Sequence, residues 1–263
     1  MLEIINPAVI GGGIAAGLFL SILLCLHIGR RLGLRAMSRT GGRGLSGVSS
    51  LESAVFALLG LLIAFTFSGA LTRFDLRRAQ VVDEANAIGT AYLRVDLLPA
   101  AAQPRLRDTF RNYVDARIAT YRLLPDLDAA RRELVRSQAL QGDIWAQSLA
   151  ATRLPESRSG TDWLLMPALN SMFDITTVRV TATQMHPPTI IYAMLIGLAL
   201  ASALLAGYQS AGEERVGWVH AIGFAGIIAF TVYVILDIEY PRLGWVRIDA
   251  IDQVLVEVRA GMR

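Results

Sequence analysis

The sequence predicts an all-α membrane protein, with four transmembrane helices and a helical-bundle extramembrane domain inserted between spans 2 and 3. The first observation is composition: 54% of the 263 residues are hydrophobic and the mean hydropathy is +0.46, which is too apolar for an ordinary soluble domain. The second is the distribution of charge, because charged residues are absent from four long windows and frequent between the second and third. No alternating strand pattern is visible in the intervening segment.

Each charge-free window is long enough to cross a bilayer, since about 20 apolar residues of helix span a hydrocarbon core of about 30 Å. We therefore predict transmembrane helices near residues 9–29, 51–71, 189–207 and 217–236. The windows are bounded by Glu3 and Arg30, Glu52 and Arg73, Arg179 and Glu213, and Arg215 and Asp237.

The predicted domain limits follow from these windows. Residues 1–71 hold the first two spans and an arginine-rich connecting loop, and residues 72–187 form the extramembrane helical domain. Residues 188–236 hold the third and fourth spans, and residues 237–263 form an amphipathic tail.

The extramembrane segment shows helical periodicity throughout. Further helices are expected to begin at Pro104, which suits a first turn, at the N-cap Asp126, and at Thr161, after a loop over 154–160. The first helix has no Gly or Pro between Ala70 and Gly89, so we expect it to continue the second span without a break. Its apolar stripe has coiled-coil-like spacing and comprises Val81, Ala85, Ile88, Tyr92 and Val95.

Charged residues interrupt the apolar stripes of this domain. Arg78 lies one turn before Val81, and a charge in a seam needs a partner. Asp237 and Glu239, at the end of the fourth span, are the predicted partners, forming with Arg78 an ion-pair cluster at the membrane surface that acts as a static clamp or as a gate element. Arg117 interrupts the stripe of the next helix.

Two further expectations concern polar residues of the domain and the tail. Glu84 is expected to be an acid on the bundle surface, and Asn86 a polar contact. Asp249 is expected to cap a C-terminal helix with one apolar face, made by Ile251, Val254, Leu255 and Val258.

The loop predicted over residues 30–47 is basic and contains no acid. One interpretation is a topology signal, which places this loop in the cytoplasm and the helical domain outside the cytoplasm, in a bacterial inner membrane. The other is a set of contacts to anionic lipid headgroups, and the two are compatible. Elsewhere arginines alternate with acids, so no nucleic acid partner is expected. The candidate lipid contacts are Arg30, Arg31, Arg35, Arg39 and Arg43.

One face of the second span is a candidate pore lining. If it faced an oligomer axis, its bulky side chains would form a hydrophobic constriction with a ring of carboxylates at the mouth, which would favour cations. In the alternative, Ser49 and Glu52 form a capping box before an apolar run that faces lipid. The candidate pore-lining residues are Glu52, Phe56, Leu59, Ile63 and Phe67.

The sequence carries no motif of an enzyme. It has no Cys-x-x-Cys pair, no glycine-rich phosphate loop, no zinc-protease motif and no nucleophile elbow. Its three histidines lack metal-ligand spacing and lie near the predicted membrane edges. We expect no catalytic residue, no metal and no cofactor.

Two segments carry a resemblance to a known family. They are "FALLGLLIAFTFSGALTRFDLRRAQVVDEANAIGTAYLRVDLLP" at 56–99 and "LDIEYPRLGWVRI" at 236–248. With four spans in this order, the chain resembles the bestrophin-like membrane proteins of bacteria, a family without an assigned activity, and more distantly the bestrophins. Bestrophins are pentameric ion channels whose second span lines the pore, and this resemblance would place the helical domain in the cytoplasm, opposite to the topology signal.

The resemblance does not extend to calcium gating, because the acidic cluster of animal bestrophins has no counterpart after Pro241. The resemblance implies a homo-oligomeric ion channel that passes monovalent ions, and the pore face, if it points to the axis, would make that channel favour cations. The alternative is a membrane-anchored helical-bundle sensor or scaffold without an ion path. Both hypotheses place the protein in a lipid bilayer, which is therefore its expected partner.

Overall fold

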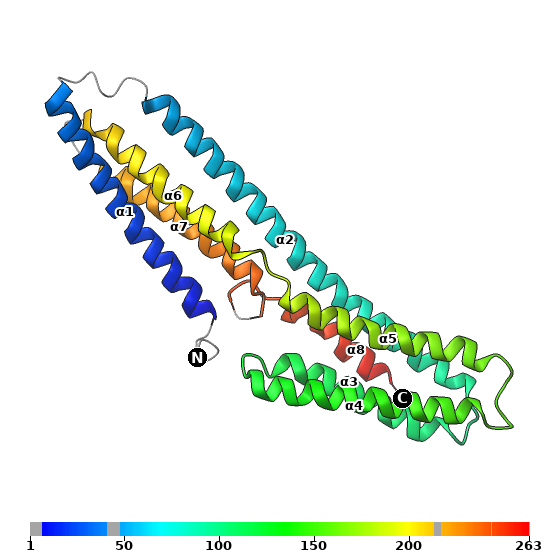
Figure 1. Ribbon diagram of the computed structural model, residues 1–263. Helices are drawn as coiled ribbons and strands as arrows, with labels where there is room; N and C mark the ends of the chain where they lie inside the picture. The colour runs from blue at the N-terminus through cyan, green and yellow to red at the C-terminus, as the bar shows by residue number, and fades with distance from the viewer. Residues whose placement is uncertain (1–6, 41–47, 213–216, 243, 263) are drawn as a thin grey trace. The chain divides into compact units, whose positions relative to one another are not determined.

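The computed structural model describes residues 7–40, 48–212, 217–242 and 244–262. These residues form helices joined by short loops, with no strand among them, which confirms the predicted all-α class. The helices are α1 (Pro7–Thr40), α2 (Val48–Arg94), α3 (Gln103–Arg122), α4 (Leu127–Thr152), α5 (Thr161–Gln184), α6 (Thr189–Gln209), α7 (Trp218–Glu239) and α8 (Gln253–Gly261), with short 3-10 helices η2 (Val95–Leu97), η3 (Ser210–Gly212) and η4 (Asp249–Asp252) (Figure 1).

Four stretches of the described chain are long and apolar enough to cross a membrane, as predicted. They are Ile10–Arg39 in α1, Ser50–Leu97 in α2 and η2, Thr161–Gly212 from α5 through η3, and Trp218–Glu239, which is α7. The chain breaks between α5 and α6 at Met185–Pro188, because the two prolines cannot donate backbone hydrogen bonds. α2 is one uninterrupted helix, which confirms that the second span continues into the first extramembrane helix.

α1 is longer than predicted. The sequence suggested a loop from residue 30 onward, but the helix continues through Thr40, so that prediction is wrong for residues 30–40. The reason is local, since Arg, Leu, Ala and Met in this stretch are good helix formers. Residues 41–47 lie outside the described part of the chain.

The chain divides into two compact units. We call residues 1–73 and 186–245 the membrane unit, and residues 74–185 and 246–263 the helical unit. α2 therefore contributes residues to both. The predicted tail is divided: residues 237–245 belong with the spans, and residues 246–263 belong with the helical unit.

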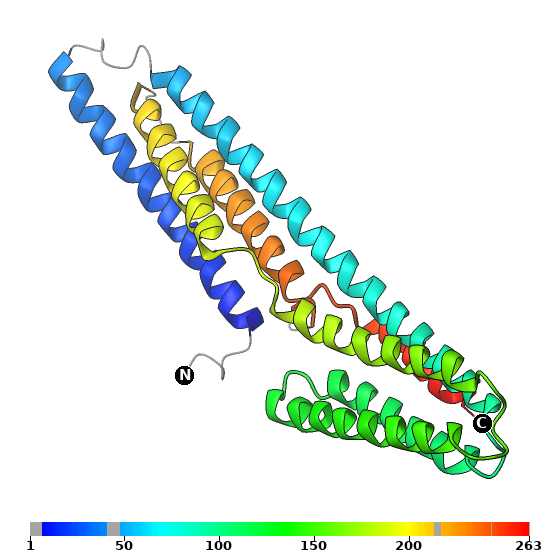
Figure 2. The ribbon, with the colours of Figure 1, turned by 45° about the vertical axis from the view of Figure 1, so that its right-hand side comes forward.

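Within the membrane unit, α1 packs closely against α6, and both views show these helices side by side (Figures 1 and 2). Glycines make this contact possible. A methyl group added at Gly29 or Gly33 would overlap the α6 backbone at Leu204 or Tyr208, and one added at Gly207 would overlap the α1 backbone at Leu26. Small residues at such positions let two membrane helices approach until their backbones touch.

The helical unit has an apolar core of its own. The stripe predicted on α2 is buried in it, and α3, α4 and α5 contribute Phe110, Ile144 and Leu169, each fully buried. The predicted helix starts are confirmed at Asp126, whose side chain accepts a hydrogen bond from the Ala129 N–H at 2.9 Å, and at Pro104 in the first turn of α3.

The C-terminal segment completes this core. Leu255 on α8 is fully buried, and the other members of the predicted apolar face pack beside it. Arg259 of α8 donates to both carboxylate oxygens of Asp115 on α3, at 2.8 and 3.0 Å. The predicted cap is wrong, because α8 begins at Gln253 and Asp249 instead pairs with Arg247.

The α1–α6 contact gives a testable prediction. Gly29→Ala should destabilise the detergent-purified protein by about 1–3 kcal/mol, because the added methyl has no room beside α6. Thermal unfolding followed by circular dichroism measures the effect. The matched control is Gly17→Ala on the same helix, where the methyl meets no atom within 4 Å and little change is expected. Equal melting temperatures for the two variants would contradict the close contact.

Candidate functional site

The predicted pore face of α2 is partly covered by the chain's own membrane unit. Leu59 is only 2% exposed, and the ring of Phe56 packs edge-to-face on Phe224 of α7 with centroids 5.6 Å apart. Glu52 and Ile63 are half-buried, while Phe67 is 38% exposed. The burial of Leu59 counts against its place in a lining shared with other chains. The pore role of the five residues stays a prediction, and the side chain of Ser49 lies outside the described set.

The opposite face of α2 is uncovered within the described chain, over the whole length of the helix. Spacings of three, four and, from Asp75 to Asp83, eight residues keep its members on one side of the helix. We call these residues the bare row. They are small or apolar in the span and become polar toward the helical unit: Ala57, Leu61, Ala64, Ser68, Thr72, Asp75, Asp83, Asn86 and Thr90.

The acid at the end of α7 is paired with an arginine of α2. Arg73 donates to Glu239 through Nε, at 3.0 and 3.1 Å from the two carboxylate oxygens, and through Nη2 at 2.7 Å. His186 Nδ1 lies 3.1 Å from the same carboxylate, and its ring stacks on Tyr240. The Glu239 side chain is fully buried, so these contacts replace the water that a carboxylate would otherwise need.

The neighbouring acid, Asp237, organises the loop that follows α7. Both of its oxygens accept the backbone N–H of Trp245 at 3.0 Å, and the Tyr233 hydroxyl lies 3.3 Å from Oδ1. A side chain on Gly244 would overlap the Asp237 carboxylate, so this position requires glycine.

Arg78 does not lie in the buried apolar stripe that α2 contributes to the helical unit. Its side chain is 49% exposed and lies 3.5 Å from Asp75, one turn earlier. Arg77 is the buried residue instead, and it donates to the carbonyl oxygens of Ala182 and Met185 at 3.1 and 3.0 Å. The seam placement of Arg78 is therefore wrong by one residue. Its pairing with Asp237 or Glu239 stays a prediction, because those acids belong to the other unit.

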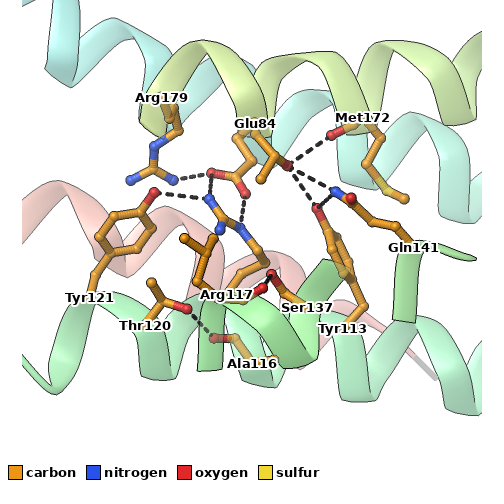
Figure 3. A network of polar contacts seen from close by, with 12 residues as sticks. Glu84, Tyr113, Ala116, Arg117, Thr120, Tyr121, Ser137, Gln141, Met172 and Arg179 are labelled. Atoms are coloured by element: carbon orange, nitrogen blue, oxygen red, sulfur yellow. Dashed lines mark hydrogen bonds and ion pairs between the residues drawn. The ribbon is translucent and has the colours of Figure 1, made fainter. Parts of the chain in front are cut away.

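A buried ion-pair network lies at the centre of the helical unit (Figure 3). Glu84 of α2 accepts from Arg117 of α3, at 2.6 Å from Nε and 3.3 Å from Nη2, and it also pairs with Arg179 of α5. The Tyr121 hydroxyl accepts from Arg117 at 2.9 Å, and its ring lies 4.1 Å below the Arg179 guanidinium. Glu84 and Arg117 are fully buried.

The charges of this network are unequal, with two arginines around one glutamate. Asp252, from the C-terminal segment, lies 3.8 Å from Arg179 and supplies a second negative charge. Burial alone would lower the pKa of Arg117, but the Glu84 carboxylate outweighs that effect and raises the pKa above its ordinary value. Arg117 therefore stays charged, and replacing its carboxylate partner would leave a buried cation uncompensated.

A neutral cluster continues the network along α3. Tyr113 and Thr176 lie with their hydroxyl oxygens 3.0 Å apart, and Gln141 of α4 donates to both at 3.3 Å (Figure 3). Burial raises the pKa of Tyr113, which keeps its hydroxyl protonated. Hydrogen-bonded polar groups in a core fix how helices align, because a shifted register would leave them unsatisfied.

The expectation that Glu84 is a surface acid is wrong. A signal in the sequence could have corrected it, since Arg117 interrupts an apolar stripe and a buried arginine requires an acid. Which acid pairs with Arg117 depends on how α2 packs against α3, and the sequence does not show that packing.

The predicted lipid-contacting arginines divide into two groups. Arg31, Arg35 and Arg39 are exposed on the last turns of α1, whereas Arg30 is half-buried. Arg43 lies outside the described residues. In the part of the chain that the structure describes, no group of three His, Cys, Asp or Glu side chains could hold a metal ion.

Comparisons with known proteins address the fold. The sequence matches the family described as a Bestrophin-like domain over residues 17–250. Two crystal structures of a bacterial bestrophin homolog from Klebsiella pneumoniae, with different single mutations, are similar to this chain. The tryptophan-to-alanine structure has a TM-score of 0.63 at 13% identity and covers 94% of this chain and 98% of its own. The tyrosine-to-alanine structure has a TM-score of 0.54 at 16% identity, with coverages of 93% and 98%. A comparison with curated proteins finds no match.

The Arg73–Glu239 pair can be tested by a double-mutant cycle. Arg73→Gln and Glu239→Gln should each destabilise the protein, and the double variant should lose less than their sum, with a coupling of about 1–3 kcal/mol. The matched control is the exposed Arg78–Asp75 pair, for which about 0.5 kcal/mol or less is expected. Chemical unfolding in detergent measures both, and equal couplings would contradict the distinction drawn between the two arginines.

The buried network predicts a large effect at Glu84. Glu84→Gln should destabilise the protein by about 3–5 kcal/mol, because two buried arginines lose their shared carboxylate. Asp83→Asn is the control, since this neighbouring acid is exposed and should change stability by less than about 0.5 kcal/mol. If both variants unfolded at the same denaturant concentration as the wild type, the buried pairing would be absent in solution.

Proposed function

This chain belongs to the bestrophin-like family, and on that premise we propose that it assembles with further copies of itself into an ion-conducting pore. Bestrophins are oligomeric ion channels, and the fold shared with a bacterial homolog extends over nearly the whole of both chains. The absence of an enzymatic motif from the sequence agrees with this function.

The observation that carries the proposal is the bare row along α2. Ser68 and Thr72 place two hydroxyl groups on this uncovered side of the helix, and the Thr72 hydroxyl donates to the Ser68 carbonyl oxygen at 2.9 Å. At an axis shared by several copies, such hydroxyls would contact water and ions. Because α2 continues beyond the span, the row could line the path through the helical unit as well.

The charge on this row favours cations. Asp75 and Asp83 are exposed on it, and Arg78 lies to its side, paired with Asp75. Asp83 has no ion pair among the described residues. Repeated around an axis, Asp75 and Asp83 would raise the local concentration of monovalent cations and lower that of anions. Glu52 lies on the opposite, bulky face of α2, so it would add a ring of carboxylates only if that face lined the pore.

For location, we propose the inner membrane of a bacterium. The arginines between the first two spans favour the cytoplasm for that end of the membrane unit, which would put the helical unit on the extracytoplasmic side. The resemblance to bestrophins favours the reverse orientation. Labelling of single cysteines in intact cells distinguishes the two.

Subunit counting and current recording test the pore. Native mass spectrometry of the purified protein should give a closed ring of several copies, and the protein in planar bilayers should pass cation-selective current. Asp83→Asn should lower the cation-to-anion permeability ratio several-fold, whereas Glu156→Gln, in an exposed loop, should leave it unchanged. Glu52→Gln should lower the ratio only if the bulky face of α2 is the lining. A ring that passes no current would contradict the pore, and unaltered selectivity in Asp83→Asn would contradict the role of the acids on the row.

Thiol labelling in the same bilayers identifies the lining face. Ser68→Cys, on the bare row, should be blocked by a charged methanethiosulfonate reagent, and Leu59→Cys, on the covered face, should not. The reverse pattern would support the bulky face as the lining.

A second candidate, a membrane-anchored sensor, rests on a groove in the helical unit. The groove has a volume of about 300 Å³, within the range of small-molecule sites, and its polar lining includes Asn86, Thr90, Arg94 and Ser171. A monomer or dimer without current would favour this function over the pore.

A further inference from the structure

The two faces of α1 have different surroundings. Leu18 and Ile22 are buried, and Gly29 and Gly33 continue the same side into the contact with α6. The other side is uncovered within the described chain: Leu20 is 65% exposed, Leu24 58% and Ile28 40%. In a membrane-spanning helix, an uncovered row of large aliphatic side chains contacts lipid acyl chains.

This lipid-facing row continues into arginines. Arg31, Arg35 and Arg39 follow Ile28 at spacings of three, four and four residues, so they lie on the same side of the helix. All three are exposed, and at 1.5 Å per residue they extend over about 12 Å of helix. The row exists because α1 remains helical to Thr40, since a loop would not fix the three side chains on one side.

No acidic side chain of the described helices around this row neutralises it. α1 contains no Asp or Glu, and neither does α6 or η3, against which it packs. α7 also packs against α1, but its two acids lie at its C-terminal end and have other partners: Asp237 accepts the Trp245 N–H and Glu239 pairs with Arg73. Among the described residues, Arg31, Arg35 and Arg39 form no ion pair. Arg30 is half-buried on a different side and does not belong to the row.

We propose that Arg31, Arg35 and Arg39 bind the headgroups of anionic phospholipids. The continuity of the row with Leu20, Leu24 and Ile28 argues for lipid over a free anion, because one molecule could place its acyl chains on the aliphatic part and its phosphate on the arginines. Exposed Leu32 and Leu34 flank the arginines and suit the boundary between headgroups and acyl chains. This interaction does not depend on the pore, and it would hold the end of α1 at the membrane surface.

Titration of the detergent-purified, full-length protein with phosphatidylglycerol, monitored by native mass spectrometry, tests the proposal. The wild type should bind phosphatidylglycerol in preference to phosphatidylcholine. Arg31→Gln/Arg35→Gln/Arg39→Gln should weaken phosphatidylglycerol binding roughly 100-fold, and Arg35→Gln alone roughly fivefold. The single variant keeps the test decisive if the triple variant folds poorly.

The matched control removes the same charge elsewhere. Arg122, Arg131 and Arg132 are exposed on the helical unit, and their triple replacement by Gln should leave binding unchanged. An equal loss in this control, or equal binding of the two lipids by the wild type, would overturn the proposal. Full displacement of phosphatidylglycerol by excess inorganic phosphate would also overturn it, because the row would then recognise phosphate without the acyl chains.

Discussion

The helical unit depends on the carboxylate of Glu84, which Arg117 and Arg179 share. Three helices meet at this group, and Asp252 adds a contact from the C-terminal segment. A charged group without water must be paired, so the packing of α2, α3 and α5 is constrained to arrangements that bring these side chains together. Apolar side chains alone would tolerate a shift of one helix along another, whereas this network would lose its hydrogen bonds.

The second constraint is the continuity of α2, which supplies residues to both units. Its covered side carries Leu59 in the membrane unit and Glu84 in the helical unit, and between them Arg73 pairs with Glu239. The uncovered side carries Ser68, Thr72 and the acids that follow. Because the same helix holds the internal contacts and the bare row, the contacts on one side fix which residues the other side leaves uncovered.

The sequence was a good guide to local structure and a poor one to charged partners. Asp126 caps α4 and the apolar face of α8 is buried, since caps and amphipathic faces depend on residues within a few turns. Arg77 and Arg78 show the difficulty, because either one continues the stripe that begins at Val81. Only packing against the end of α5 selected Arg77.

By itself, the sequence determined the number of candidate spans, the all-α class, the break before α6 and the unbroken α2, because hydropathy, helix propensity and proline act locally. The tertiary structure alone decided the side of α2 left uncovered, the burial of Glu84 between two arginines, and the glycine contact of α1 with α6. These features depend on which surfaces meet across long stretches of chain. A residue's type shows that it needs a partner, but only the packed structure shows which partner lies within reach.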